Sequence, residues 1–471
     1  MSERIPVKDV SPPARKTNAK KRAPVDRYNP QEQIYVREQK GLFQRVRKYM
    51  GWLFIAAFVL VPFIPYGDRQ AILFDIAARQ YHFFSLTLWP QDLLLLAGFF
   101  IIAAFALFFI TTFLGRVWCG YLCPQTVWTF IFIWFEERIE GSANKRRKLD
   151  QSAWNVNKIW RKTAKHAAWG AVSVFTALSF AAYFVPVKQL WWDFFTFNAT
   201  SGVTFSIIFF AVATYANAGW MRTIVCTHMC PYARFQSAMF DKDTFIVGYD
   251  TQRGETRGPR KRNADPKALG LGDCVDCDLC VQVCPAGIDI REGLQYECIN
   301  CGACIDACDQ TMERMHYPKG LIRYTTEHNL AGQKTAILRP KLIGYGVVLT
   351  VMLVAFVMTL INIKPMQLDV LRDRSSLYNE NAEGLIENTY TLKVINKSSE
   401  AQAFQLSVLG LEEVEWLGAH QVEVKGGEVL NLPVTLVSDP YLLPRPITDI
   451  EFVMQSNGQQ VTQHSRFISG G

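Results

Sequence analysis

The 471-residue chain has no cysteine outside the interval from Cys119 to Cys308. A secreted protein held together by disulfides would place cysteines throughout its folded domains, so that class is excluded. All twelve cysteines lie inside the interval, and the residues after Cys308 have none. We also expect no cleavable signal peptide, because the first apolar run begins near Tyr49, after a long polar tail.

The sequence also lacks the motifs of several cofactor classes. No Gly-rich phosphate loop occurs in a strand–loop–helix setting, which argues against a nucleotide or flavin site. Only seven histidines are present, and few of them, such as His166 and His228, lie near apolar segments, so a bis-histidine haem is disfavoured. The net charge of +8 comes largely from the N-terminal tail and Asn144–Lys148. Basic loops beside membrane spans explain this charge better than a nucleic-acid partner does.

Five apolar segments are long enough to cross a bilayer, although the mean hydropathy of the whole chain is only +0.05. This combination is typical of apolar spans joined to polar domains. The predicted spans cover Met50–Tyr66, Asp92–Leu114, Ala164–Val185, Val203–Trp220 and Leu342–Ile363. A shorter apolar stretch, Gln125–Phe135, is interpreted as an interfacial or partly buried helix.

The density of Lys and Arg alternates from one loop to the next. The N-terminal tail, the loop after the second span and the segment Met221–Lys341 are rich in both. The loop after the first span has only Arg69 and Arg79, and the loop after the third has only Lys188. The positive-inside rule therefore predicts a cytoplasmic N-terminus and a C-terminus on the opposite side.

The predicted domain order has five parts. They are a basic tail at 1–48, a four-span membrane domain at 49–240, a cysteine-rich domain at 241–338, a fifth span at 339–363 and a final domain at 364–471. In the final domain, segments such as "YTLKVINK" and "VLNLPVTLVS" alternate apolar with polar residues, which indicates a small antiparallel sandwich. We interpret this sandwich as an interaction or structural module.

The segments "CVDCDLCVQVCP" and "CINCGACIDACD" both have the spacing C-x2-C-x2-C-x3-C. This run is typical of bacterial two-cluster ferredoxins, in which the fourth cysteine of each run binds the other cluster. One 4Fe–4S cluster is assigned to Cys274, Cys277, Cys280 and Cys308, and the second to Cys298, Cys301, Cys304 and Cys284. Two zinc sites are the alternative, but zinc motifs usually place cysteine pairs farther apart. Asp309 stands where a second proline is expected, and the eight-cysteine spacing is intact.

Two further cysteine pairs share the frame Cys-x3-Cys-Pro, and each follows a long apolar run. They are Cys119 with Cys123, and Cys226 with Cys230. Because proline follows Cys123 and Cys230, both are predicted to mark the start of a helix. The positive end of the helix dipole would lower their pKa values and favour thiolate.

Three roles for these membrane-edge pairs remain open on the residues alone. Buried cysteines can serve as packing, although the repeated frame argues against it. A transient redox disulfide is a second role, and a permanent one is disfavoured in a reducing cytosol. A copper site is the third, because thiolates select Cu(I), and His228 is a candidate additional ligand. Met229 is interpreted as packing. One-electron reduction of a metal held by the pairs is the simplest chemistry that uses both the pairs and the clusters.

These motifs together resemble the FixG/RdxA family, also called CcoG, of cytochrome c oxidase accessory proteins. The resemblance covers nearly the whole chain after about the first thirty residues. It implies a membrane polyferredoxin-like protein of mixed fold, with about five spans, a ferredoxin-like α+β domain and an immunoglobulin-like C-terminal sandwich. It also implies a bacterial inner membrane, with the ferredoxin domain cytoplasmic and the sandwich periplasmic.

The same resemblance implies a function in assembly of the cbb3-type cytochrome c oxidase. The chain would reduce Cu(II) to Cu(I) for copper-delivery proteins, and Cys119, Cys123, Cys226 and Cys230 would handle the copper. A quinol-linked electron-transfer subunit without copper and a non-redox assembly scaffold are the alternatives. The electron donor and the oligomeric state stay open, and a homo-oligomer is among the expectations.

Overall fold

The structure, a computed structural model, describes most of the chain from residue 34 onward. The described ranges are 34–67, 69–84, 86–262, 265–266, 268–362, 364–373, 376–398, 400–411, 413–443 and 445–469. The first 33 residues of the predicted basic tail therefore lie outside the described part. Two compact units are present. Unit 1 comprises the residues up to Phe54, Ile110–Ser173 and Ala211–Leu342, and unit 2 comprises Ile55–Phe109, Val174–Phe210 and the residues from Ile343 onward.

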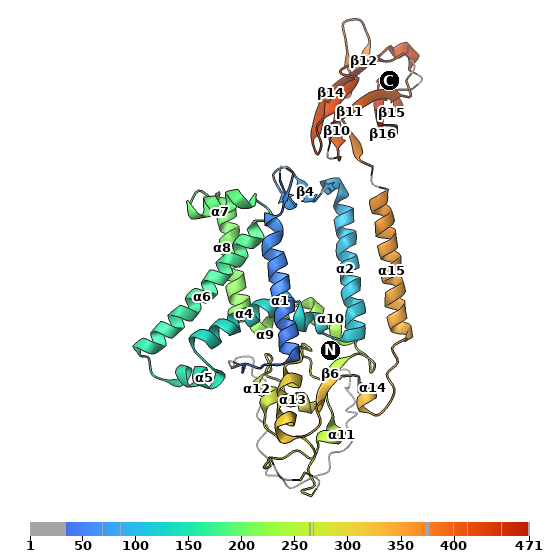
Figure 1. The fold of residues 1–471 in the computed structure, drawn as a ribbon. Helices are drawn as coiled ribbons and strands as arrows, with labels where there is room; N and C mark the ends of the chain where they lie inside the picture. The colour runs from blue at the N-terminus through green and yellow to red at the C-terminus, as the bar shows by residue number, and fades with distance from the viewer. Residues whose placement is uncertain are drawn as a thin grey trace, which may run out of the picture. The chain divides into compact units, whose positions relative to one another are not determined.

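Four helices in the described ranges are long and apolar enough to cross a membrane. They are α1 (Leu42–Leu60), α2 (Leu93–Leu114), α8 (Ser201–Gly219) and α15 (Pro340–Ile361), all visible in Figure 1. These helices correspond to four of the five predicted spans. The remaining prediction, Ala164–Val185, falls largely on α6 (Val156–Ala181). Helix α6 forms, but it is not among the four because its first half is rich in Lys and Arg.

Helix α1 begins at Leu42, whereas the sequence placed the first span from Met50 onward. The basic residues before Met50 do not prevent helix formation, because a remote residue caps the first turn. The Asp306 carboxylate accepts hydrogen bonds from the backbone N–H groups of Phe43 at 3.2 Å and Gln44 at 2.8 Å. Arg47 is buried and stacks over the Phe130 ring at 3.9 Å. The start of α1 is thus fixed by capping and packing rather than by hydropathy.

The remaining helices of the membrane region are shorter. They are α3 (Val117–Tyr121), α4 (Pro124–Ile139), α5 (Ala143–Gln151), α7 (Val187–Phe195), α9 (Arg222–Ile224), the π-helical turn η3 (Val225–Met229) and α10 (Pro231–Met239). Helix α4 contains the stretch predicted as a partly buried helix, and one of its faces is buried, including Phe132 and Ile133.

The cysteine-rich domain of unit 1 is closed by a two-stranded antiparallel sheet. Strand β6 (Ile246–Tyr249) precedes both cysteine runs and pairs with β7 (Ile322–Thr325), which follows them. The helices here are α11 (Thr251–Gly254), α12 (Leu279–Gln282), the 3-10 turn η4 (Ile290–Glu292), α13 (Ala303–Met315) and α14 (Glu327–Leu330). The apolar core between sheet and helices includes Val247, Met312 and Ile322, so an α+β domain surrounds the cysteines.

Unit 2 contains a small sheet in a region for which the sequence analysis predicted only a loop. Strands β3 (Ile72–Asp75), β4 (Gln80–Phe83) and β5 (Leu86–Leu88) form an antiparallel sheet, preceded by the pair β1 (Pro65–Tyr66) and β2 (Arg69–Gln70). Short 3-10 turns flank it at η1 (Val61–Phe63) and η2 (Pro90–Asp92). The segment "QYHF" alternates polar with apolar residues, whereas "ILFD" does not, and each strand is only four residues long, so the signal for this sheet is weak.

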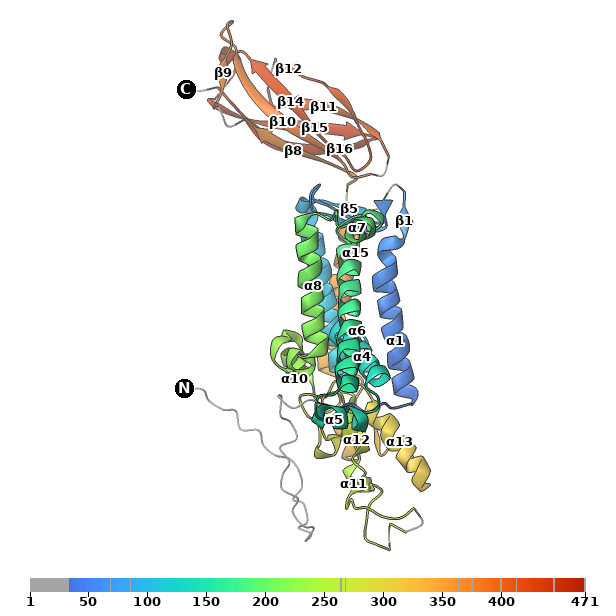
Figure 2. The ribbon, with the colours of Figure 1, turned by 90° about the vertical axis from the view of Figure 1, so that its left-hand side faces the viewer.

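The C-terminal domain is an all-β sandwich of two antiparallel sheets (Figure 2). One sheet has the order β12-β14-β10-β8, with β9 paired to β10, and the other has the order β13-β11-β15-β16. The strands are β8 (Met366–Arg372), β9 (Asn379–Glu380), β10 (Ile386–Asn396), β11 (Gln402–Leu409), β12 (Glu415–Leu417), β13 (Gln421–Val424), β14 (Val429–Ser438), β15 (Ile447–Ser456) and β16 (Gln459–Ile468), with the 3-10 turn η5 (Pro440–Leu442). Tyr390, Phe404 and Phe452 fill the core between the sheets and are fully buried.

The cap on α1 generates a first prediction. Replacing Asp306 by Ala leaves two N–H groups of α1 without their acceptor and should lower the free energy of unfolding by about 1 kcal/mol. The variant Asp306→Asn keeps an acceptor oxygen and should lose less. Thermal unfolding in detergent, followed by helical circular dichroism, measures both. An Ala variant as stable as the original chain would contradict the capping role.

Candidate functional site

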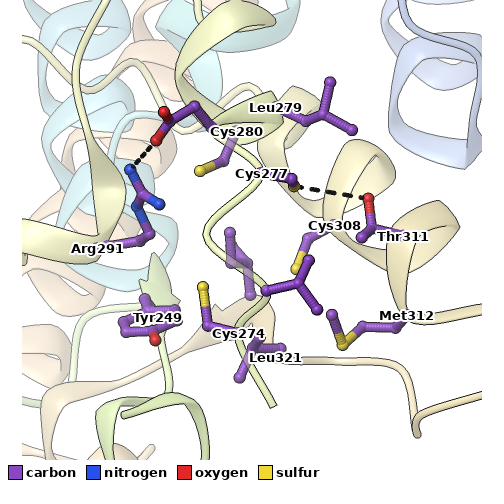
Figure 3. A pocket seen from close by; sticks show the side chains of 13 residues that line it. Tyr249, Cys274, Cys277, Leu279, Cys280, Arg291, Cys308, Thr311, Met312 and Leu321 are labelled. Carbon is purple, nitrogen blue, oxygen red and sulfur yellow. Dashed lines mark hydrogen bonds and ion pairs between the residues drawn. The ribbon is translucent and has the colours of Figure 1, made fainter. Parts of the chain in front are cut away.

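The eight cysteines of the two ferredoxin runs line two separate cavities in unit 1. Cavity A, of about 350 Å³, is lined by Cys274, Cys277, Cys280 and Cys308, together with apolar residues such as Leu321 and Met312. Cavity B, of about 380 Å³, is lined by Cys284, Cys298, Cys301 and Cys304, and Cys280 also reaches its wall. Figure 3 shows the four sulfur atoms of cavity A around a shared space. Each cavity thus takes its fourth cysteine from the other run.

The two runs wind around their cavities with the same backbone pattern. In the first run, Asp276 and Asp278 have positive φ angles of 52° and 53°. In the second, Asn300 and Gly302 occupy the matching positions, with φ angles of 52° and 72°. These left-handed residues reverse the chain between successive cysteines, so three sulfurs can face one centre. Helices α12 and α13 then begin directly after each loop. Cys284 follows the end of α12, and Cys308 lies within α13.

The residues of both cavities fit a 4Fe–4S cluster. Each cavity offers four thiols inside an apolar wall. Backbone N–H groups of Ala286 and Ile288 point at the sulfur of Cys284, which is the hydrogen bonding that tunes iron–sulfur sites. Burial raises the pKa of Cys280 and of Cys284 to about 12. These thiols are therefore protonated when no metal is bound, and cluster binding would release their protons. When bound, such clusters supply one-electron transfer.

The two membrane-edge pairs have closely similar local backbones. The Cys123 N–H donates to the Trp118 carbonyl at 2.9 Å, and the Cys230 N–H donates to the Val225 carbonyl at 2.8 Å. Both bonds span five residues, which is the geometry of a π-helical turn and is frequent at functional sites. Cys123 and Cys230 are also the N-cap residues of α4 and α10, as the prolines predicted.

The expected lowering of the cysteine pKa at a helix start is wrong for Cys123. Burial raises the pKa of Cys123, and it outweighs the backbone N–H groups of Thr126 and Gln125 at the start of α4. Burial, with a smaller contribution from the other pair, also raises the pKa of Cys119 to about 11 and of Cys226 to about 12. The helix dipole is therefore weaker here than desolvation.

The four membrane-edge thiols act on one another across the two motifs. Cys123 and Cys230 raise the pKa of Cys119, and Cys123 and Cys119 raise the pKa of Cys226. The structure thus brings the two pairs into one neighbourhood.

Polar side chains that the sequence analysis did not single out hold this neighbourhood together. The Gln125 amide donates to the carbonyls of Asn217 at 2.8 Å and Arg222 at 3.3 Å, and so ties α4 to the segment before Cys226. The amide of Gln236, which is fully buried, donates to the Cys119 sulfur at 3.4 Å. The sequence does contain one signal for polar contacts at this site, because an arginine, Arg116 or Arg222, stands shortly before each cysteine pair.

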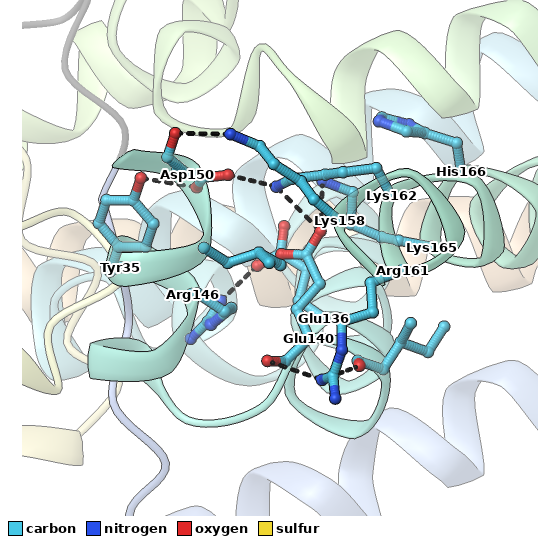
Figure 4. A network of polar contacts seen from close by, with 12 residues as sticks. Tyr35, Glu136, Glu140, Arg146, Asp150, Lys158, Arg161, Lys162, Lys165 and His166 are labelled. Carbon is cyan, nitrogen blue, oxygen red and sulfur yellow. Dashed lines mark hydrogen bonds and ion pairs between the residues drawn. The ribbon is translucent and has the colours of Figure 1, made fainter. Parts of the chain in front are cut away.

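A buried ionic network connects α4 with α5 and α6 (Figure 4) and also includes Arg222, which precedes the second pair. Glu136 of α4, which is 1% exposed, binds Arg146 at 2.5 Å and Arg222 at 2.5 Å. Glu140 binds Lys162 at 3.0 Å and Lys165 at 3.2 Å. Arg222 is the first residue of α9, so this network fixes the position of the turn that contains Cys226.

Helix α3 packs directly on the loop that lines cavity B. A Cβ atom at Gly120 would lie 2.7 Å from the Ile299 carbonyl oxygen and 3.0 Å from the Cys301 Cα, so only glycine fits. The Tyr121 hydroxyl donates to the Cys301 carbonyl at 3.3 Å and contacts the Tyr324 hydroxyl at 3.1 Å. Cys119 is therefore one residue away from a backbone contact with a predicted cluster ligand.

The predicted histidine ligand lies in the same turn as Cys226. The His228 ring is exposed, and its Nδ1 contacts the Thr227 hydroxyl at 2.6 Å. Met229 was expected to be a packing residue, but its side chain is 57% exposed. His166, considered for haem, contacts the Tyr215 hydroxyl through Nδ1 at 2.7 Å.

Three family models match parts of this chain. A 4Fe-4S dicluster domain matches residues 221–327, a 4Fe-4S binding domain matches 96–139, and the IG-like fold at the C-terminal of FixG matches 356–470. The nitrogen fixation protein FixG of Rhizobium meliloti is 33% identical over 85% of this chain and 84% of its own length. Protein RdxA of Cereibacter sphaeroides is 36% identical over 86% of this chain and 87% of its own length.

The chain belongs to the FixG/RdxA family. A crystal structure of a FixG-related protein from Vibrio parahaemolyticus is 44% identical, covers 22% of this chain and 97% of that chain, and has a TM-score of 0.22. Family membership confirms the predicted mixed architecture, with membrane helices, 4Fe–4S domains and an immunoglobulin-like C-terminal domain. This member of the family is a membrane iron–sulfur protein, and the match to a dicluster domain favours iron over the zinc alternative.

The crossed arrangement of the cavities yields a second prediction. Cys284→Ala should remove the cluster of cavity B and about half of the iron, because its partners are Cys298, Cys301 and Cys304. Adding Cys298→Ala should then remove little more iron. Adding Cys277→Ala should remove most of the remainder. Iron analysis of the purified variants measures this. If Cys298→Ala instead removes most of the remaining iron and Cys277→Ala removes little, each run binds its own cluster.

Proposed function

We propose that this FixG/RdxA-family chain is a membrane-bound copper reductase that serves assembly of a cbb3-type cytochrome c oxidase. The observation that carries the proposal is the backbone contact between α3, which contains Cys119, and the loop that contains Cys301. In the proposed step, Cu(II) accepts one electron and becomes Cu(I), while the donating cluster is oxidised by one electron. A cytoplasmic one-electron donor then restores the reduced cluster, and the Cu(I) passes to a copper-delivery protein.

The four membrane-edge sulfurs are the proposed copper-handling groups. Thiolates prefer Cu(I) to harder ions, so the product of the reaction is held more tightly than the substrate. Cys119 and Cys226 lie in buried surroundings that raise their thiol pKa values, and copper binding would therefore release protons. The exposed ring of His228 and its contact with Thr227 favour an all-sulfur site.

The proposed location is the inner membrane of a bacterium, with the ferredoxin domain in the cytoplasm and the sandwich in the periplasm. This topology needs five crossings, so α6 must cross as well. Lys158 and Lys165 of α6 are each 5% exposed, whereas Ile159 and Trp160 are 52% and 69% exposed. Membrane helices commonly turn ionisable residues to the protein interior and apolar residues to lipid. The burial pattern of α6 therefore supports a fifth span.

The double variant Cys226→Ser/Cys230→Ser tests the copper site. It should abolish Cu(II) reduction, because hydroxyl groups bind Cu(I) poorly, and it should leave the cluster absorbance intact. Purified protein is reduced, freed of excess reductant and mixed with Cu(II), and a Cu(I)-specific chelator reports the product. Unchanged product formation would remove the assignment of the copper site to this pair, and His228→Ala in the same assay decides whether His228 belongs to the site.

Gly120→Ala tests the electron path. The added methyl group must push α3 away from the loop between Cys298 and Cys301, so reduction of Cu(II) should slow without being abolished. Gly170→Ala is a matched control, because a Cβ atom at Gly170 in α6 meets nothing within 4 Å. Rapid mixing of reduced protein with Cu(II) measures the rate of cluster oxidation. Equal rates in Gly120→Ala and the control would remove this contact from the path.

A further inference from the structure

Arg116 occupies the position between cavity B and the membrane-edge pairs. It is 4% exposed. Its guanidinium donates to the Tyr296 carbonyl at 2.5 Å and to the Ala233 carbonyl at 2.8 Å, and it stacks over the Tyr296 ring at 4.7 Å. Tyr296 is two residues before Cys298, and Ala233 is three residues after Cys230. Arg116 therefore contacts the loop of cavity B and the segment of the second pair at once.

The charge of Arg116 lacks the usual compensation. Both of its hydrogen-bond acceptors are neutral carbonyls, and within the described residues no carboxylate is ion-paired with it. A buried guanidinium is costly unless negative charge lies nearby. Arg116 acts electrostatically on Cys298 of cavity B, as well as on Cys119 and Cys226 of the membrane-edge pairs, and the thiolates of a cluster in cavity B would be a negative group within its reach. The placement thus fits a permanently anionic neighbour.

Cavity A presents the opposite arrangement. Its buried arginine, Arg291, is bound by three carboxylates, Asp276 at 2.8 Å, Asp278 at 2.6 Å and Asp289 at 2.6 Å. The positive charge of Arg291 is therefore more than neutralised beside cavity A. The positive charge of Arg116 beside cavity B is not.

We propose that Arg116 is a positioning residue for electron transfer, and that it raises the reduction potential of the cluster in cavity B. Reduction adds one negative charge to the cluster, and a nearby uncompensated positive charge stabilises that reduced form. The electron would then be held in the cavity that touches α3, next to the membrane-edge thiols. This inference rests on the proposed function only for the destination of the electron, because the potential itself does not involve copper.

Removing the negative charge of Glu297 changes the charge beside cavity B in the opposite direction to removing the positive charge of Arg116. It is half-buried and adjacent to Cys298, and it acts on that cysteine electrostatically. Asp306, on α13 between Cys304 and Cys308, is engaged by the N–H groups of Phe43 and Gln44, and Asp289 is bound by Arg291. Neutralising Glu297 should therefore raise the potential that neutralising Arg116 lowers.

The test is a redox titration of the intact purified protein, followed by electron paramagnetic resonance. Arg116→Gln should make one of the two clusters about tenfold harder to reduce at a fixed potential, a shift of about 59 mV for a one-electron couple. Glu297→Gln should shift the same cluster in the opposite direction. Arg116→Lys keeps the charge without the two-carbonyl geometry and should shift it less. Arg161→Gln is the matched control, because Arg161 also donates to two backbone carbonyls, those of Ile139 and Glu140.

The outcomes separate this inference from the proposed function. A shift confined to one cluster, with opposite signs in Arg116→Gln and Glu297→Gln, supports the role of Arg116. Unchanged potentials in Arg116→Gln, or equal shifts in the Arg161→Gln control, overturn it. If Arg116→Gln fails to retain its clusters, Arg116→Lys and Glu297→Gln decide, and unshifted potentials in both overturn it. Copper reduction is measured separately, so absence of Cu(II) reduction by the unaltered chain, together with the expected shifts in the variants, would reject only the proposed function.

Discussion

The close approach of two backbones at Gly120 is the constraint on which the candidate site depends. Because position 120 has no side chain, α3 lies against the loop of Ile299 and Cys301 without an intervening layer. Tyr121 then bonds to the carbonyl of Cys301, and Arg116 bonds to that of Tyr296. A segment that carries one membrane-edge pair is thereby attached to a cluster cavity at several points.

The cysteine chemistry could be read from the sequence because it is local. Three cysteines two residues apart need only a short left-handed loop to converge, and Asp276, Asp278, Asn300 and Gly302 supply that loop in both runs. The prolines after Cys123 and Cys230 likewise predicted the starts of two helices, α4 and α10. The sandwich was predictable for the same reason, since alternation within each strand already shows which face is buried.

The features that the sequence did not reveal depend on remote partners. Hydropathy averages a helix around its whole circumference, so it could not show that Lys158 and Lys165 of α6 are buried while Trp160 is exposed. Glu136 meets Arg222, and Gln236 meets Cys119, across roughly a hundred positions of sequence. The pKa direction of Cys123 was misjudged because burial, which depends on the tertiary fold, outweighs the helix dipole.

The carboxylate that caps α1 lies between two predicted cluster ligands, Cys304 and Cys308, on α13. The opening turn of the first membrane helix therefore gains its cap only when that short helix is formed. In a metal-dependent domain, such a helix forms together with its cluster. Loading of the cavities with iron and the ordering of the first apolar helix would then depend on the same short segment of the chain.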